Sequence, residues 1–367
     1  MELQGILDKA KATRRRLSGR ELEYLLSLDS ESEQQRLFDA AYEIKLAYIG
    51  KKVSIRGLIE MGNVCAKNCY YCGIRRGNTA VRRFELDIDA IERMARWAYE
   101  HRYGSLVLQS GEVESEKRTE FVEEALRRIM KLSGGRLGIT LSLGEQRDEV
   151  YRRWHEAGAR RYLLRLETSS PAFYRELHPA DHNFFRRRRC LSVLRRIGYQ
   201  VGSGVMIGLP GQTLKQLARD LEFFGRADLD MIGMGPYLPH HATPLGKDIA
   251  FTPEYRRRQL LLGLKTVAVC RLYLHDVNIA STTALQALAP DGRERGLLAG
   301  ANVVMPNITD TCYRKDYFLY ENKPGSDENS AESLAAFERS IANIGEEILW
   351  GEHGDSKHYF SRTGADD

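Results

Sequence analysis

Three closely spaced cysteines are the residues of this chain best suited to chemistry. Cys65, Cys69 and Cys72 form a C-x3-C-x2-C run, with Tyr71 directly before the last cysteine. A structural zinc site needs four ligands, and a 4Fe-4S cluster is also held by four, normally all cysteine. Three thiolates with no fourth ligand nearby therefore favour a cluster with one open iron, where a small molecule can bind.

A partial zinc knuckle and a set of disulfides are the competing interpretations of this triplet. The run lacks the paired C-x2-C layout of a zinc ribbon. Cys190, Cys270 and Cys312 each stand alone, which is typical of a reducing compartment and argues against disulfides. A cytoplasmic enzyme is the expectation, because the N-terminus has no apolar signal region and no stretch is apolar over the length of a membrane span.

The elements that must position these cysteines alternate along the chain. Between amphipathic helical stretches lie short apolar runs at 53–59, 105–109, 137–143, 161–166, 200–207, 231–234, 278–281 and 301–305. Strand–helix alternation predicts a parallel sheet, and eight repeats predict a closed (β/α)8 TIM-type barrel. An open doubly wound sheet is the alternative fold. We expect N-terminal helices over 1–51, the barrel over 52–310 and a C-terminal extension over 311–367, with a mobile polar tail from Gly354.

Polar side chains follow several of the predicted strands. In a barrel of this type, catalytic groups lie on the loops after the strand C-termini. The first strand leads directly into the cysteine loop, and the second leads into Gln109, Ser110 and Glu112 around a glycine. On the third strand, Thr140 and Ser142 alternate inward. Hydroxyls that only satisfy strand ends are the plainer interpretation of this last pair.

The fourth predicted strand carries charges on its inward face. Arg161, Arg165 and Glu167 share one face by the period of two. Charges among strand hydrophobics are costly unless they are paired or used. An internal ion pair between Arg165 and Glu167 is one interpretation. The other is a binding site, because an arginine fork suits a carboxylate and a glutamate can accept hydrogen bonds from a ribose.

The net charge of +5 is modest, and part of it is the run of four arginines from 186 to 189. Such a run is more often a solvated helix face than a nucleic-acid site, and no interleaved aromatic residues offer stacking surfaces for bases. We therefore expect no nucleic-acid partner and no membrane partner.

Taken together, these stretches resemble the radical S-adenosylmethionine (SAM) enzymes, and within them the HydE family of FeFe-hydrogenase maturases. The resemblance runs through most of the chain up to about residue 320 and rests on the cysteine loop with V-L-Q-S-G-E, T-L-S-L-G-E and G-L-P-G-Q-T, at 107–112, 140–145 and 208–213. Single motifs are shared with biotin synthase and methylornithine synthase, and the combination is most similar to the maturases.

The resemblance implies a 4Fe-4S cluster on Cys65, Cys69 and Cys72. It further implies reductive cleavage of SAM to a 5′-deoxyadenosyl radical, used in assembling the diiron subsite of the hydrogenase active site. The implied cofactor-binding residues are Tyr71, Gln109, Ser110, Glu112, Ser142, Arg165, Glu167 and Arg187, the last being one of four neighbouring arginines that could take this role. The implied substrate-binding residues are Thr140, Arg161, Thr282, Thr283, Asn307 and Tyr313.

The partners implied by the resemblance are a small-molecule or iron–cysteine complex as substrate, a reductant such as ferredoxin or flavodoxin, and other hydrogenase maturases. Some members carry a second cluster motif near the C-terminus. Here Cys312 stands alone and no cysteine follows it, so we expect no second cluster. Two alternatives stay open: a radical SAM mutase or synthase acting on an organic substrate, similar to methylornithine synthase or biotin synthase, and a non-catalytic scaffold that binds zinc or a cluster.

Overall fold

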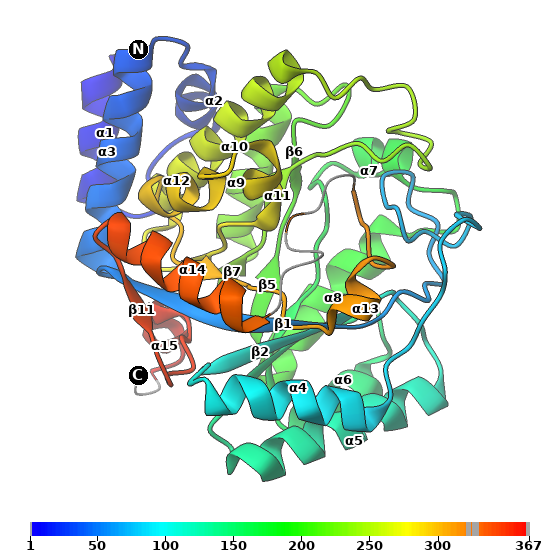
Figure 1. Cartoon of the computed structure of the whole chain (residues 1–367). Coiled ribbons are helices and arrows are strands. Elements are labelled where there is room, and N and C mark those ends of the chain that lie inside the picture. The colour runs from blue at the N-terminus through cyan, green and yellow to red at the C-terminus, as the bar shows by residue number, and fades with distance from the viewer. Residues whose placement is uncertain (1, 321–323, 325–329, 365–367) are drawn as a thin grey trace.

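A parallel barrel forms the body of the protein (Figure 1). The structure is a computed structural model that describes residues 2–320, 324 and 330–364. Eight strands pair in the order β10-β1-β2-β3-β4-β5-β7-β9. A parallel bridge between Ala280, next to β9, and Val303 of β10 joins the two ends of this path. The predicted (β/α)8 barrel is therefore confirmed.

The barrel strands are long on one side and short on the other. Their bounds are β1 Lys52–Gly62, β2 Ser105–Ser110, β3 Gly138–Ser142, β4 Ala159–Leu163, β5 Gln200–Ser203, β7 Met231–Ile232, β9 Asn278–Ile279 and β10 Val303–Val304. A separate short pair continues two of them, β6 Met206–Ile207 with β8 Gly235–Pro236. One further strand, β11 Glu347–Leu349, pairs in parallel with the start of β1.

Helices surround this sheet and extend it at both ends of the chain. Three helices precede the barrel, α1 Leu3–Ala12, α2 Gly19–Ser27 and α3 Glu31–Tyr48. The helices around the barrel are α4 Ile88–Glu100, α5 Glu116–Ser133, α6 Asp148–Glu156, α7 Pro171–Leu177, α8 Phe184–Ile197, α9 Leu214–Arg226, α10 Pro253–Leu274, α11 Thr283–Leu288 and α12 Gly292–Leu298. The C-terminal region adds α13 Thr311–Arg314, α14 Ser330–Asn343 and α15 Lys357–Thr363.

Local sequence explains why these segments are helical. On α5 the buried residues Val122, Leu126 and Ile129 recur at helical spacing, so one face packs on the sheet. A capping box precedes α2, because the Ser18 hydroxyl accepts from the backbone N–H of Glu21 and the Glu21 carboxylate accepts from the N–H of Ser18.

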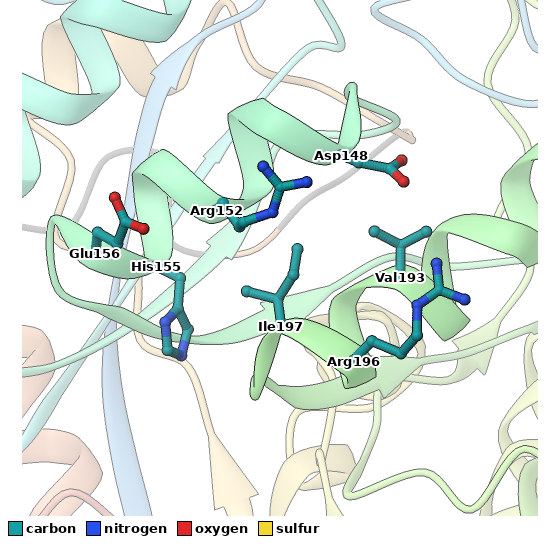
Figure 2. Close-up of a pocket in the computed structure, with 7 residues that line it drawn as sticks. All are labelled: Asp148, Arg152, His155, Glu156, Val193, Arg196 and Ile197. Atoms are coloured by element: carbon teal, nitrogen blue, oxygen red, sulfur yellow. The ribbon is translucent and has the colours of Figure 1, made fainter.

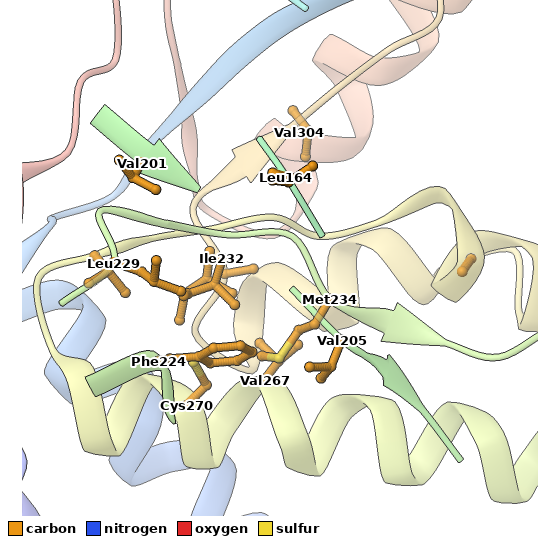
Figure 3. Packing of buried hydrophobic residues seen from close by; sticks show 14 of the residues in the cluster. Leu164, Val201, Val205, Phe224, Leu229, Ile232, Met234, Val267, Cys270 and Val304 are labelled. Atoms are coloured by element: carbon orange, nitrogen blue, oxygen red, sulfur yellow. The ribbon is translucent and has the colours of Figure 1, made fainter. Parts of the chain in front are cut away.

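The hydrophobic core lies between the strands and the helices (Figure 3). Phe224 of α9 and Val267 and Cys270 of α10 are buried against Ile232 of β7 in this cluster. Cys270 is thus a packing residue, and burial raises the pKa of its thiol to about 12.

The two terminal regions pack against the barrel. Helix α3 lies against α10 and α2 against α9, and Figure 1 shows the blue N-terminal helices beside α10. The prediction of a mobile tail from Gly354 was wrong for the residues described. Ser356 and His358 are buried, the backbone N–H of Ser356 donates to Gln200, and His358 lies between the carboxylates of Asp228 and Asp276.

Candidate active site

The cysteine loop follows β1 and rests on the turn after β2. The Ala66 N–H donates to the Glu112 carbonyl at 2.8 Å, and the Glu112 N–H donates to the Cys65 sulfur at 3.3 Å. A side chain on Gly111 would place its Cβ 2.2 Å from the Val64 carbonyl oxygen. Only glycine permits this approach, so the glycine of the S-G-E turn brings the loop onto the barrel mouth.

The three thiols share an environment that disfavours their charged form. All three cysteines are half-buried and unbonded. Burial raises the pKa of Cys65 and brings that of Cys69 to about 12. Burial first, and then the neighbouring thiolates of Cys69 and Cys65, raise the pKa of Cys72 well above its usual value. Bound iron would reverse this, because a coordinating thiol is deprotonated outright.

The donor set of the loop fits a 4Fe-4S cluster with one iron left open. Its three thiols are the ligand type that such clusters take. Within the residues described, no three His, Cys, Asp or Glu side chains are arranged around the position of a single metal ion.

Beside the loop, two acidic and two basic side chains form a compact group that we call the four-charge cluster: Lys67, Glu112, Glu145 and Arg187. Lys67 Nζ lies 3.1 Å from Glu112 Oε1. Arg187 Nη1 lies 3.1 Å from Glu112 Oε2 and 3.0 Å from Glu145 Oε1. Burial by itself lowers the pKa of Arg187, but the two carboxylates raise it well above its usual value. The Arg187 guanidinium is therefore held in its charged form.

Tyr71 and a buried histidine form a second contact of the loop. The His178 Nδ1 atom lies 2.8 Å from the Tyr174 carbonyl oxygen, so Nδ1 carries the proton and donates. The other ring nitrogen, Nε2, then accepts from the Tyr71 hydroxyl at 3.1 Å. Burial lowers the pKa of His178 to about 3, which keeps the ring neutral. This pair holds the residue between the last two cysteines.

A second histidine contacts a cysteine directly. His182 Nε2 lies 3.6 Å from Cys69 Sγ, and His182 Nδ1 lies 2.8 Å from Asp181 Oδ1. The backbone N–H of Asn68 also points at Nε2, at 3.4 Å. His182 therefore belongs to the candidate site, because it contacts one of the three cysteines of the loop.

Arg165 and Glu167 are joined as an ion pair at the end of β4. Arg165 Nη2 lies 2.8 Å from Glu167 Oε2, and the Arg165 carbonyl accepts from Arg187 Nε at 2.6 Å. The ion-pair interpretation is thus realised, and it also ties both residues to the four-charge cluster. Glu167 has a φ of +68°, a conformation that costs energy for a residue with a side chain. The surrounding contacts must hold it there.

The other predicted cofactor residues lie at the C-terminal ends of β2 and β3, which we call the rim of the barrel. Gln109 Nε2 donates to the Tyr317 hydroxyl at 3.1 Å, and the Ser110 hydroxyl accepts from Arg118 at 2.6 Å. Ser142 is half-buried at the end of β3, where it is the register partner of Gln109.

Four of the predicted substrate residues lie after the last strands. The Asn307 amide donates to Glu60 Oε2 at 3.0 Å, and the ring of Tyr313 packs 5.2 Å from that of Phe84. Thr282 and Thr283 are half-buried at the start of α11. The hydroxyl oxygen of Thr282 is buried without a hydrogen-bond partner among the residues described.

Thr140 and Arg161 are placed away from this rim. Arg161 Nε donates to the Thr140 hydroxyl at 2.9 Å, and Arg161 Nη2 donates at 2.7 Å to Ser105, the first residue of β2. Asp355 of the C-terminal segment forms an ion pair with the same guanidinium. These contacts lie toward the strand N-termini, opposite the cysteine loop. Thr140 also lines a small cavity of about 30 Å³ inside the barrel.

Several residues of the site were missed by sequence reasoning. Glu145 ends the T-L-S-L-G-E segment and Lys67 lies inside the cysteine loop, so the motifs contained a signal for both. His178 and His182 had none, because they follow α7 in a segment without a motif and meet the loop only in the folded chain.

A hollow on the outer surface is separate from this site (Figure 2). It lies between α6 and α8, has a volume of about 360 Å³ and is lined in part by Arg152, His155 and Arg196. It shares no residue with the cysteine loop or the four-charge cluster.

Comparison with known proteins places this geometry in context. The model of the Radical SAM superfamily matches residues 59–224. The [FeFe] hydrogenase maturase subunit HydE of Thermotoga maritima is 42% identical over 85% of this chain and 86% of its own. The 3-methylornithine synthase of Methanosarcina acetivorans is 27% identical over 78% and 79%, and the biotin synthase of Geobacillus kaustophilus is 30% identical over 67% and 75%.

Solved structures share the fold. A crystal structure of methylornithine synthase superposes with a TM-score of 0.79 at 23% identity, covering 94% of this chain and 98% of that one. The maturase HydG from Carboxydothermus hydrogenoformans superposes with a TM-score of 0.76 at 21% identity, over 95% and 79%. Among the helices described, none has both the length and the apolar character to cross a membrane.

Proposed function

This chain belongs to the HydE family of [FeFe]-hydrogenase maturases, which are radical SAM enzymes, and we propose which of its residues bind the cluster, SAM and the substrate. The family's cofactors are a 4Fe-4S cluster and SAM. When bound, they supply a 5′-deoxyadenosyl radical from the one-electron cleavage of SAM. The observation that carries the assignment of residues is that the cysteine loop, Glu112 and Arg187 meet at one end of the barrel.

Cys65, Cys69 and Cys72 are proposed to hold the cluster. Three thiols in one half-buried loop support this assignment, as does the lone placement of Cys190 and Cys312 elsewhere. Cys190 is buried in α8 and Cys312 is exposed in α13, so neither is a natural fourth ligand.

The four-charge cluster is proposed to bind the amino-acid end of SAM. That end carries an ammonium and a carboxylate, so it is matched by a carboxylate and a guanidinium. Glu112 already accepts from Lys67 and Arg187 and can exchange a protein cation for the ammonium. Arg187, which contacts both acids, is the proposed partner of the SAM carboxylate. Glu167 is proposed to accept from the ribose, with Tyr71, Gln109, Ser110, Ser142 and Arg165 completing the wall of the cofactor site.

We propose that the substrate enters above the last strands and lies within the barrel. The half-buried polar residues Thr282, Thr283, Asn307 and Tyr313 would meet it there, and Thr140 and Arg161 would contribute from deeper in the barrel. By analogy with the relatives, the substrate would be a small molecule, specifically an iron–cysteine complex, used in building the diiron subsite of the hydrogenase. Other hydrogenase maturases would act with this enzyme, and a ferredoxin or flavodoxin would supply the electron.

Anaerobic reconstitution tests the cofactor chemistry. The protein loaded with iron and sulfide is mixed with SAM and dithionite, and 5′-deoxyadenosine is measured. We expect its formation in the wild type and its loss, together with the brown chromophore, in Cys65→Ala, Cys69→Ala and Cys72→Ala. The triple variant of Cys190, Cys270 and Cys312 to alanine is the matched control and should keep about four irons per chain. A wild type that holds iron but forms no 5′-deoxyadenosine would support a scaffold instead.

A maturation assay tests the biological role. The gene is expressed beside an [FeFe]-hydrogenase and the remaining maturases in a host that lacks its own HydE. Hydrogen production that depends on this chain supports the proposal. Turnover of SAM with no hydrogenase activation would favour the alternative of an organic substrate, as in methylornithine synthase or biotin synthase.

A further inference from the structure

The proposed reaction consumes one electron for each SAM cleaved, and that electron must come from outside the protein. Under the proposed function, on which this point rests, the electron must enter through a surface close to the cysteine loop. The cysteine loop lies at the side of the molecule beside α7 and α8 in Figure 1, where its ribbon is blue and theirs is green.

A direct contact joins Cys69 to the chain segment that precedes α8. The Cys69 sulfur lies 3.6 Å from His182 Nε2. The neighbouring Asp181 is exposed over 59% of its side chain and lies 3.8 Å from Arg76 of the cysteine loop. The exposed Asp181 is therefore joined to the Cys69 sulfur through the single residue His182.

Aromatic rings continue from this contact to the surface. The His182 ring lies 5.3 Å from that of His178, which stacks on Tyr174 at 3.9 Å. Tyr174 lies 5.4 Å from Phe184, and Phe184 lies 5.3 Å from Phe185. Phe185 is 65% exposed, an unusual state for so large an apolar side chain.

The surface around Phe185 is rich in positive charge. Arg186, Arg188 and Arg189 follow Phe185 on α8 and are exposed, and Arg76 lies 3.8 Å from Asp181, four residues before Phe185. Arg76 and Arg189 are 60% and 59% exposed, and their partners Asp181 and Asp148 are surface carboxylates. Exposed pairs of this kind are worth only about 0–1 kcal/mol, so an incoming acidic protein can replace them.

We propose that Arg76, Phe185 and Arg189 form the docking surface for a small acidic one-electron carrier protein of the ferredoxin or flavodoxin class. An exposed aromatic residue with cations around it suits a partner whose redox centre is ringed by carboxylates. The transfer is outer-sphere: the carrier loses one electron, the 4Fe-4S cluster gains it, and no bond between the proteins forms or breaks. We call these three residues the docking surface.

Binding is measured on the cluster-loaded enzyme with oxidised ferredoxin, and separately with oxidised flavodoxin, by calorimetry. We expect the double variant Arg76→Glu/Arg189→Glu and the variant Phe185→Ala each to weaken binding about tenfold, and the wild-type affinity to fall as salt is added. The matched control is Arg226→Glu. Like Arg76 and Arg189, Arg226 is an exposed arginine (66%) paired with a carboxylate, that of Glu222. It is the last residue of α9 and is not part of the docking surface.

Two electron sources separate docking from chemistry. With dithionite, which needs no docking surface, all variants should form 5′-deoxyadenosine at the wild-type rate, which also reports intact folding and cluster content. With reduced ferredoxin or flavodoxin, the docking-surface variants should reduce the cluster about tenfold more slowly. The milder double variant Arg76→Gln/Arg189→Gln should reduce the cluster at a rate between that of the charge-reversed variant and that of the wild type.

The outcomes are distinct. Failure of the wild type with dithionite would overturn the proposed function. Unchanged binding and reduction in the docking-surface variants with both carriers, or an equal effect of Arg226→Glu, would overturn the docking proposal alone. So would light scattering that shows a dimer broken by Phe185→Ala, because this face would then be covered by a second copy of the chain.

Discussion

Gly144 fixes the position of Glu112 in the four-charge cluster. Gly144 has a φ of +76°, and a Cβ built on it would lie 2.2 Å from both Cγ and Oε2 of Glu112. The carboxylate therefore occupies space that any other residue at 144 would fill. The turn after β3 is shaped around the acid that follows β2.

Gly144→Ala should therefore weaken SAM binding by about tenfold or more, because displacing a carboxylate loses a charge-assisted hydrogen bond worth roughly 1.5–3 kcal/mol. SAM affinity is measured on the anaerobic, cluster-loaded protein. Gly211→Ala is the matched control, since Gly211 has a φ of +77° with nothing within 4 Å of its Cβ position. Equal losses of affinity in both variants would mean that backbone strain alone is responsible.

Glu167 has two possible duties, and one substitution separates them. If Glu167 binds SAM, Glu167→Gln should lower SAM affinity about tenfold while the cluster stays intact. If it serves only to pair with Arg165, the variant should unfold at a lower temperature with unchanged affinity. Both quantities are measured on the same anaerobic sample. An unchanged affinity would remove Glu167 from the cofactor site.

The sequence predicts residues that act together with their neighbours in the chain. It does not predict contacts between residues that are far apart in the sequence. The cysteine triplet and the S-G-E turn could be predicted because spacing alone limits what they do. His182 could not, since its contact with Cys69 joins positions 113 residues apart. The pairing of Arg161 with Asp355 joins positions 194 apart, and nothing near either residue indicates it.

Among the elements, the turn after β4 is anchored by a buried acid on α9. Asp220 Oδ1 accepts from the backbone N–H of Ser169 at 2.6 Å, while its other oxygen has no hydrogen-bond partner among the residues described. Burial raises the pKa of Asp220 to about 6. The folded protein thus holds this proton more tightly than the unfolded chain does.

Asp220 should make the fold less stable as pH rises. A carboxyl whose folded pKa lies above its unfolded value contributes stability that is lost as pH rises from about 4 to 6 and beyond. Between pH 5.5 and 7.5, this group should cost the wild type about 1 kcal/mol of unfolding free energy. Asp220→Asn, which keeps the acceptor for Ser169, should remove that part of the pH dependence. Urea unfolding gives the unfolding free energy of both proteins at the two pH values. An equal change of this free energy with pH in the wild type and in Asp220→Asn would contradict the prediction.

The order and type of the barrel elements could be predicted, but some ends could not. The run at 200–207 is one apolar stretch in the sequence, yet it is divided into β5 and β6. The predicted strand at 161–166 instead begins at Ala159 and ends as a strand at Leu163, although its hydrogen bonds to the next strand continue to Glu167. Apolar pattern marks burial, and it does not report where the backbone bends.

Across the whole molecule, the C-terminal region is built into the end of the barrel opposite the cysteine loop. Lys45 of α3 and Glu346 are fully buried and form an ion pair at 2.7 Å. The Gly354 carbonyl accepts from Arg56 and from Asn278, both at 2.9 Å. We propose that the N-terminal helices, the barrel and the C-terminal extension unfold as one unit.

Asp355 is the acid beside two buried arginines of the barrel, and its removal should weaken the whole fold. It pairs with Arg161, which is 1% exposed. Burial, and next the charge of Arg161, lower the pKa of Arg56 to about 9, so positive charge is already disfavoured there. Asp355→Asn should reduce the unfolding free energy by about 3 kcal/mol, because a buried cation loses its partner. Dithionite-driven SAM cleavage at low temperature should persist, since the cysteine loop is at the other end.

Glu352→Gln, which removes an exposed partner of Lys52, is the control and should change stability by less than about 1 kcal/mol. Equal effects of the two variants in urea unfolding would show that the segment contributes little to holding the barrel closed.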